Sequence, residues 1–235
     1  MKFTVIILAG GKGKRIKKFT KKKPKPMVEF LGKPFIEYQI ELLKKQQFKR
    51  IIISVGHYGK QIIKFFKKKN FSDLNISFSI DGKKPLGTGG ALKKIFKNHK
   101  GNFIVMYGDS YLPIDLKKIQ EKFIESKKDV LLTIYRNKNK YDKSNIKIKN
   151  KKIYYNKHHP DIEMNYIDYG LSIIKGKLLK NYYKQKNFDL SDLFNKLCIE
   201  QKIAYTIVKK RFYEIGSYKG IEEFKKYIKE KKNVH

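Results

Sequence analysis

The sequence has 235 residues, of which 40% are hydrophobic and 14% aromatic. This length suits one large domain or two small ones, and the apolar share excludes a disordered chain. The 56 lysine and arginine residues outnumber the 21 acidic residues and give a net charge of +35. Only four of them are arginines, so the basic residues favour a solvated surface over a nucleic-acid-binding face, which uses arginine. We therefore expect no nucleic acid among the partners, although the charge should attract anionic substrates.

Targeting and metal-binding signals are weak in this sequence. The first apolar run, residues 4–8, is too short for a signal peptide, and no stretch has the roughly eighteen apolar residues that a membrane span needs. Cys198 is the single cysteine, so it can form neither an intrachain disulfide nor a metal cluster. His158 and His159 are adjacent and lack a third ligand, which favours polar surface. These features predict a cytoplasmic protein with no membrane partner.

In the first half, short β-branched segments alternate with longer amphipathic segments, which is typical of βαβ units and a mostly parallel sheet. Residues 51–53 are apolar without alternation, as expected for a strand that is covered on both faces. The predicted strands are residues 4–8, 50–55, 75–80, 102–107 and 129–135. The predicted helices are residues 34–46, with Pro34 in the first turn, and residues 57–69, 88–97 and 116–126.

The second half continues the same core with a more polar region. Residues 138–155 predict a hairpin or meander, residues 169–175 and 203–208 predict strands, and residues 218–231 predict an amphipathic helix. Residues 189–201 predict a helix with Asp189 or Ser191 near its cap. No internal repeat or linker interrupts the chain. The expected fold is α/β and Rossmann-like, with a mostly parallel central sheet flanked by helices and a small β-containing subregion.

A glycine-rich loop follows the first predicted strand, at residues 8–15 (LAGGKGKR). Glycines let backbone N–H groups approach an anion, and strand-to-helix loops at this sheet edge bind ligands in open α/β folds. A Rossmann fingerprint would need Gly or Ala where Ile16 stands, and a Walker loop would need Ser or Thr where Arg15 stands. Neither NAD nor ordinary ATPase chemistry is favoured. Farther along, Lys25 is bracketed by Pro24 and Pro26, which stiffen the chain around it.

This loop, together with residues 25–28 (KPMV) and 32–36 (GKPFI), resembles the N-terminal signature of sugar-1-phosphate nucleotidyltransferases. That family contains glucose-1-phosphate thymidylyl- and uridylyltransferases and mannose- and heptose-1-phosphate guanylyltransferases. The resemblance implies that Arg15 and Lys25 hold nucleotide phosphates. Lys14 stands where the family usually has Thr. The other residues that the resemblance assigns to nucleotide binding in this loop are Leu8, Ala9, Gly10, Gly11, Gly13 and Lys14.

A second glycine motif occupies residues 85–92 (PLGTGGAL) and resembles the family segment whose backbone meets the nucleobase. It implies nucleotide binding by Gly87, Gly89 and Gly90. The alternative is that Thr88 is a plain helix N-cap and the glycines form a tight turn. In residues 107–109 (YGD), the strand-ending Asp109 corresponds to the family's Mg²⁺-binding aspartate. A carboxylate there suits Mg²⁺ held jointly with phosphate oxygens.

The resemblance is thinner in the second half. It implies that Lys157 holds the sugar phosphate and that Asp168 and Gly170, in residues 168–172 (DYGLS), lie where relatives meet the sugar. Residues 212–217 (FYEIGS) resemble the family's late Asp-x-Gly motif, which would make Glu214 the second Mg²⁺ ligand. The alternative is that Glu214 is an ordinary strand-edge acid and that Asp109 binds the ion with water and phosphates alone.

The resemblance implies an enzyme that joins an NTP to a sugar 1-phosphate and releases an NDP-sugar and pyrophosphate. Mg²⁺ is the implied cofactor, Arg15, Lys25 and Asp109 are the implied catalytic residues, and the product is expected to feed cell-envelope polysaccharide or lipopolysaccharide synthesis. Residues 1–235 are expected to form one domain, with a nucleotide-binding half (1–135) and a sugar-phosphate-binding half (136–235). The sequence leaves the base, the sugar and the oligomeric state open, a homo-oligomer included. The alternatives are a cytidylyltransferase for a non-sugar phosphate such as choline phosphate, a non-catalytic nucleotide-sugar-binding protein, and a nucleic-acid-binding module.

Overall fold

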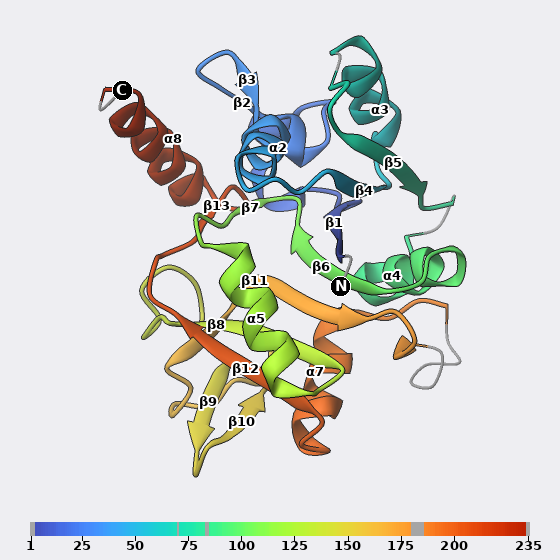
Figure 1. Ribbon diagram of the computed structural model, residues 1–235. Helices are drawn as coiled ribbons and strands as arrows, with labels where there is room; N and C mark the ends of the chain where they lie inside the picture. Colours follow the sequence, from blue (N-terminus) through green and yellow to red (C-terminus); the bar gives the residue numbers. More distant parts are fainter. Residues whose placement is uncertain (1–2, 70, 83–84, 180–185, 234–235) are drawn as a thin grey trace.

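The computed structural model describes residues 3–69, 71–82, 85–179 and 186–233 (Figure 1). Within these ranges, nine strands form one sheet whose centre is parallel. The parallel strands run in the order β5 (Asn75–Ile80), β4 (Arg50–Val55), β1 (Phe3–Ala9) and β6 (Asn102–Tyr107). On the far side of β6 follow the antiparallel β11 (Tyr166–Lys175), then β8 (Val130–Arg136) and β12 (Ile203–Val208). The hairpin of β9 (Ile146–Lys149) and β10 (Lys152–Tyr155) joins one end of β11.

Helices cover both faces of this sheet (Figure 1). One face carries α2 (Phe35–Lys45), α3 (Gly59–Lys68) and α5 (Leu116–Ser126), and the other carries α4 (Gly87–Asn98) and α7 (Leu190–Ile199). Successive side chains of a strand point to opposite faces, so Val5 and Ile7 enter one core while Ile6 enters the other. Double coverage explains the unbroken apolar runs in the sequence, and the predicted α/β fold class is confirmed.

A third apolar cluster binds the C-terminal helix to the N-terminal half. Helix α8 (Tyr218–Lys232) places the fully buried Phe224 edge-on against Phe30 and Phe35. Phe30 belongs to a small hairpin of two two-residue strands, β2 (Glu29–Phe30) and β3 (Lys33–Pro34). Just before α8, β13 (Tyr213–Glu214) pairs with β7 (Ser110–Tyr111). This packing holds the C-terminal segment beside the turn that follows β6.

Most predicted elements are present, with a few shifted boundaries. Helix α2 begins at Phe35, and Pro34 occupies the N-cap position as the last residue of β3 instead of the first helical turn. Strand β11 begins at Tyr166, whereas the predicted strand began at residue 169. Its pairing with β8 shifts register between Asp168 and Ser172, and such an irregularity interrupts the alternation of side chains that marks a strand in a sequence. The sequence did not indicate the two-residue strands or the short helices η1 (Lys14–Ile16), α1 (Lys17–Thr20) and η2 (Lys25–Met27). Segments this short show no hydrophobic period.

Candidate active site

The strand order reverses between β1 and β6, which is where open parallel sheets bind ligands. The chain passes from β1 outward to β4 and β5 and then returns to place β6 on the other side of β1. A cavity of about 320 Å³, which we call the switch-point cavity, lies at the carboxyl ends of these strands. The sequence-predicted residues that line it are Leu8, Ala9, Gly10, Gly11, Lys25, Gly87 and Asp109. Residues from both predicted glycine motifs therefore meet at one site.

Lys25 and Asp109 form an ion pair in this cavity although they are far apart in the sequence. Lys25 Nζ donates to Asp109 Oδ2 at 2.8 Å, and the two side chains are 14% and 30% exposed. Lys25 is the first residue of the short helix η2. Pro24 before it and Pro26 after it restrict the backbone on both sides of Lys25. Asp109 lies two residues beyond the end of β6, at the edge where the parallel strands end. The ammonium group of Lys25 can bind a phosphate, and the carboxylate of Asp109 can bind a metal ion.

Gln39 holds the turn that carries Asp109, a role that the sequence analysis did not predict. This side chain is fully buried in α2, and its Nε2 donates to Tyr107 O at 2.9 Å and to Ser110 O at 2.8 Å. Both carbonyls flank Asp109 in the chain. Gln39 lies among the apolar residues that α2 buries, and buried amides form specific hydrogen bonds. A polar residue at an apolar position of an amphipathic helix was therefore the signal that could have identified it.

Arg15 and Glu214 lie next to the Lys25–Asp109 pair. A Cβ added to Gly216 would lie 2.7 Å from Glu214 Oε2, 3.2 Å from Arg15 Nη2 and 3.4 Å from Lys25 Nζ. Arg15 is exposed, and the β13–β7 pairing sets Glu214 opposite Ser110. The structure thus brings the three implied catalytic residues and Glu214 together.

The carboxylate of Glu214 is already hydrogen-bonded to the start of α8. It accepts bonds from the backbone N–H of Gly216 and from the hydroxyl of Ser217. Ser217 in turn caps α8 by accepting from Gly220 N at 2.9 Å. Across the described ranges, no three His, Cys, Asp or Glu side chains are grouped as a metal site would need. Of the two predicted metal ligands, Asp109 lines the switch-point cavity and Glu214 does not.

The second glycine motif packs against a distant segment of the chain. Gly89 N and Gly90 N both donate to Phe188 O, at 3.0 and 3.3 Å. Gly87 lines the cavity, whereas Gly89 and Gly90 are buried beneath Phe188 and Lys186. Gly13 is also outside the cavity lining, and a Cβ added there would lie 3.5 Å from Lys25 Cβ. Lys14 lies in η1. These glycines allow two backbones to meet closely at the edge of the cavity.

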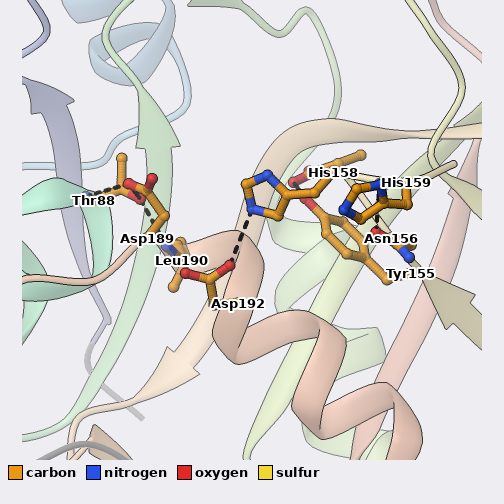
Figure 2. Close-up of polar contacts among 9 residues, drawn as sticks. Thr88, Tyr155, Asn156, His158, His159, Asp189, Leu190 and Asp192 are labelled. Atoms are coloured by element: carbon orange, nitrogen blue, oxygen red, sulfur yellow. Dashed lines mark hydrogen bonds and ion pairs between the residues drawn. The ribbon is translucent and has the colours of Figure 1, made fainter.

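Thr88 and Asp189 cap each other's helices, as Figure 2 shows. Asp189 Oδ1 accepts from Thr88 N at 3.3 Å in the first turn of α4, and Thr88 Oγ1 accepts from Leu190 N at 2.8 Å in the first turn of α7. Asp189 occupies the N-cap position of α7, as predicted, but its side chain makes no capping bond to that helix. The N-cap of α4 is Leu86, so the alternative that Thr88 is the N-cap of its own helix is wrong. The exchange fixes the N-termini of both helices at the cavity, where Thr88 and Asp189 are lining residues.

Two of the predicted sugar-phosphate residues, Asp168 and Gly170, lie close to Tyr107, which lines the cavity. Gly170 adjoins the Tyr107–Ser110 turn, since an added Cβ would lie 3.4 Å from Tyr107 Cδ2 and from Ser110 Oγ. Asp168 accepts from Gly170 N at 2.9 Å and from the Tyr155 hydroxyl at 3.4 Å. Burial raises the pKa of Asp168 to about 6, against the opposing effects of the Gly170 N–H and the positive charge of Lys157. The exposed Lys157 is thus close enough to Asp168 to act on its charge.

The histidines next to Lys157 are surface residues, as the sequence predicted. His158 Nε2 lies 3.2 Å from Asp192 Oδ1 in the first turn of α7, and His159 N donates to Asn156 Oδ1 at 2.9 Å (Figure 2). Both histidines are exposed. Cys198 is buried within α7, and burial raises the pKa of its thiol to about 12.

A family model described as nucleotidyl transferase matches residues 4–231. The chain belongs to this family. Its relatives include D-glycero-alpha-D-manno-heptose 1-phosphate guanylyltransferases from Campylobacter jejuni (45% identical over 122 residues, 52% of this chain and 53% of that protein) and from Aneurinibacillus thermoaerophilus (38% identical over 130 residues, 55% of this chain and 56% of that protein). The chain spans about half the length of these curated relatives. The family resemblance predicted from the sequence is confirmed.

Solved structures share the whole fold. HddC from Yersinia pseudotuberculosis matches with a TM-score of 0.80 at 28% identity, over 97% of this chain and all of that chain. The same protein complexed with GMP-PN matches with a TM-score of 0.78. A protein named a putative glucose-1-phosphate thymidylyltransferase, from Bacillus anthracis, matches with a TM-score of 0.83 over 96% of this chain and 95% of that chain. At 18% identity, this match shows the fold alone. In the described part of the chain, no helix is both long and apolar enough to cross a membrane.

Proposed function

We propose that this chain transfers the guanylyl group of GTP to a heptose 1-phosphate and releases a GDP-sugar and pyrophosphate. One observation carries the proposal: the switch-point cavity joins a glycine loop, the cation of Lys25 and the carboxylate of Asp109 at the end of β6. The heptose 1-phosphate guanylyltransferase relatives support the choice of guanine and heptose, and the HddC complex with GMP-PN supports guanine. The substrates would meet in the cytoplasm, and the product would serve envelope polysaccharide or lipopolysaccharide synthesis.

In this reaction, an oxygen of the sugar phosphate attacks the α-phosphorus of GTP in line. The new phosphorus–oxygen bond forms as the bond to the β-phosphate oxygen breaks, and the electron pair leaves with pyrophosphate. Both reactants are polyanions, so the chain must mainly neutralise charge and align the groups. Arg15 neutralises the departing pyrophosphate, Lys25 holds the α-phosphate, and Lys157 holds the sugar phosphate. Residues 1–135 would thus bind the nucleotide and 136–235 the sugar phosphate.

Asp109 is suited to Mg²⁺, which typically takes one or two protein carboxylates and completes its shell with water and phosphate oxygens. When bound, the ion would act as a Lewis acid on the phosphate oxygens. The ion pair with Lys25 holds the Asp109 carboxylate at the cavity and leaves both groups ready to exchange partners for substrate.

Glu214 stays the predicted second Mg²⁺ ligand, and its bonds to Gly216 and Ser217 support the alternative with Asp109 alone. If Glu214 binds the ion, Glu214→Gln should raise the Mg²⁺ requirement sharply, while Glu214→Asp stays active. An unchanged Mg²⁺ requirement in the Gln variant would assign Glu214 to holding the start of α8.

A pyrophosphate-release screen tests the proposed function. GTP, ATP, CTP, UTP and dTTP are each combined with heptose, mannose and glucose 1-phosphates and with choline phosphate. We expect turnover with GTP and heptose 1-phosphate. Turnover only with CTP and choline phosphate would establish the alternative enzyme, and no release from any pair would contradict catalysis.

Two variants test whether Arg15 acts on the nucleotide and Lys157 on the sugar phosphate. Arg15→Ala should lower kcat/KM mainly for the nucleotide, and Lys157→Ala mainly for the sugar phosphate. The same substrate dependence in both variants would contradict it.

A further inference from the structure

We propose that His158 is a positioning residue that holds the loop carrying Lys157 against the first turn of α7, through its contact with Asp192. This inference rests on the proposed function, in which Lys157 holds the sugar phosphate. It adds to that function a link between the Lys157 loop and the wall of the switch-point cavity. His158 itself touches neither substrate.

The loop begins where β10 ends, and its base is fixed to the sheet. Tyr155 is the last residue of β10, and its hydroxyl donates to Asp168 Oδ2 of β11 at 3.4 Å. Asn156 N donates to Asn145 O at 2.9 Å. Lys157 follows directly and is exposed. A long lysine side chain loses conformational freedom when it is ordered, so the place of its ammonium group depends on how firmly the backbone of the loop is held.

Two contacts hold the loop beyond Lys157. Within the loop, His159 N donates to Asn156 Oδ1 at 2.9 Å and closes a local turn. Toward α7, His158 Nε2 lies 3.2 Å from Asp192 Oδ1 (Figure 2). The first contact fixes the shape of the turn, whereas the second joins residues 34 positions apart. The contact between His158 and Asp192 therefore sets where the turn lies relative to α7.

The other side of this contact leads to the wall of the switch-point cavity. Asp192 N donates to Asp189 O at 3.1 Å in the first turn of α7. Thr88 Oγ1 accepts from Leu190 N in the same turn, at 2.8 Å. Thr88 and Asp189 line the cavity. Figure 2 shows these residues in sequence between the cavity wall and His158. One series of contacts thus connects the nucleotide cavity with the loop of the proposed sugar-phosphate lysine.

The exposure of this contact favours a role in positioning over a role in stability. The side chains of His158 and Asp192 are 61% and 43% exposed, and exposed pairs add little to the stability of a fold. In-line transfer is more demanding, because it needs the sugar phosphate aligned with the α-phosphorus of the nucleotide. A small displacement of Lys157 relative to the cavity wall is therefore expected to affect use of the sugar phosphate more than folding.

His159 provides a matched control in the same loop. It is exposed like His158, and its backbone N–H donates to Asn156. His159→Ala removes an imidazole next to the one removed by His158→Ala and keeps that backbone bond. Only the imidazole that contacts α7 is expected to matter.

Steady-state kinetics of the full chain with GTP and heptose 1-phosphate test the effect on the reaction. His158→Ala and Asp192→Ala should each lower kcat/KM for the sugar phosphate by about three- to fivefold, mainly through a higher KM, and leave KM for GTP unchanged. The double variant should lose no more than either single variant, because both substitutions break the same contact. His159→Ala should match the wild-type chain, and circular dichroism confirms that each variant is folded.

Hydrogen exchange of the substrate-free chain, followed by mass spectrometry, tests the holding of the loop directly. After correction for intrinsic rates, residues 156–159 should exchange faster in His158→Ala and Asp192→Ala than in the wild-type chain or His159→Ala. This measurement needs no turnover. It therefore still judges the contact if the wild-type chain releases no pyrophosphate and the proposed function fails.

Two results would overturn the inference. Wild-type exchange of residues 156–159 in both His158→Ala and Asp192→Ala means that their contact does not hold the loop. In a chain that releases pyrophosphate, a wild-type kcat/KM for the sugar phosphate in these variants, or an equal loss for GTP, means that the contact does not position Lys157.

Discussion

Adding one methyl group at Gly89 tests how the second glycine motif is held. A Cβ there would lie 2.1 Å from Cε2 of Phe188, so the ring must move. Phe188 is buried, and expelling such a ring costs about 1.5–3 kcal/mol. Alanine is a better helix former than glycine by about 1 kcal/mol. The two effects leave Gly89→Ala less stable by about 0.5–2 kcal/mol.

Thermal and urea unfolding measure this loss. The melting temperature should fall by about 2–4 °C for each kcal/mol in a chain of this size. Gly82→Ala is the control, because a Cβ at Gly82 would have no heavy atom within 4 Å, and its stability should change by less than about 0.5 kcal/mol. Moving Phe188 also displaces Asp189, which lines the cavity, so nucleotide binding should weaken in Gly89→Ala.

Two measurements of stability could refute the steric clash between an added Cβ at Gly89 and the ring of Phe188. Helix propensity alone makes Gly89→Ala more stable than the wild-type chain, so a raised melting temperature would refute the steric argument. In the Phe188→Ala background the clash is absent, and Gly89→Ala should then be neutral or stabilising. The same destabilisation in both backgrounds would show that Phe188 is not its cause.

Three further outcomes are expected. Gln39→Leu removes the donor to the carbonyls of Tyr107 and Ser110, so it should lower the free energy of unfolding in urea by about 1–3 kcal/mol. It should also lower kcat, because the turn that carries Asp109 moves. A wild-type free energy of unfolding together with a wild-type kcat would refute the role of Gln39 in holding this turn. Asp109→Asn should keep the fold by circular dichroism and lose most turnover, and near-wild-type rates at saturating Mg²⁺ would contradict its role. Burial raises the pKa of Asp168 from 3.8 to about 6, so the folded chain binds this proton more tightly than the unfolded chain. The free energy of unfolding contributed by Asp168 therefore falls as pH rises from about 4 to about 6, and Asp168→Asn should remove that slope in urea titrations, whereas equal slopes would contradict it.

Local patterns in the sequence were sufficient for the main elements of the fold. Unbroken apolar runs such as Ile51–Ile53 marked strands that are buried on both faces, and alternation with amphipathic segments marked the parallel sheet. The resemblance to the family identified Lys25 and Asp109, which the structure joins in one ion pair. These signals come from residues close together in the chain or from a known motif.

Contacts between distant segments were not predictable in the same way. Asp81 is a lone acid after a strand, and its burial depends on the backbone of Gly10 and Gly56 from two other strand ends. The mutual capping of Thr88 and Asp189 joins residues about a hundred positions apart. A capping residue normally serves the helix that it precedes, so sequence spacing assigned Asp189 to its own helix.

The glycines of this chain have a wider use than the binding of anions. Gly10 and Gly11 line the cavity, but Gly89 and Gly90 lie beneath Phe188 and Lys186 and bring α7 against α4. Without that close approach, Thr88 could not reach Leu190 N, and the two helix N-termini would not meet at the cavity. Helix N-termini carry partial positive charge, so their convergence favours a bound anion as the lysines do. A glycine-rich motif at this sheet edge therefore indicates where two backbones pack closely. That packing forms the anion-binding site, because it brings two helix N-termini to the cavity.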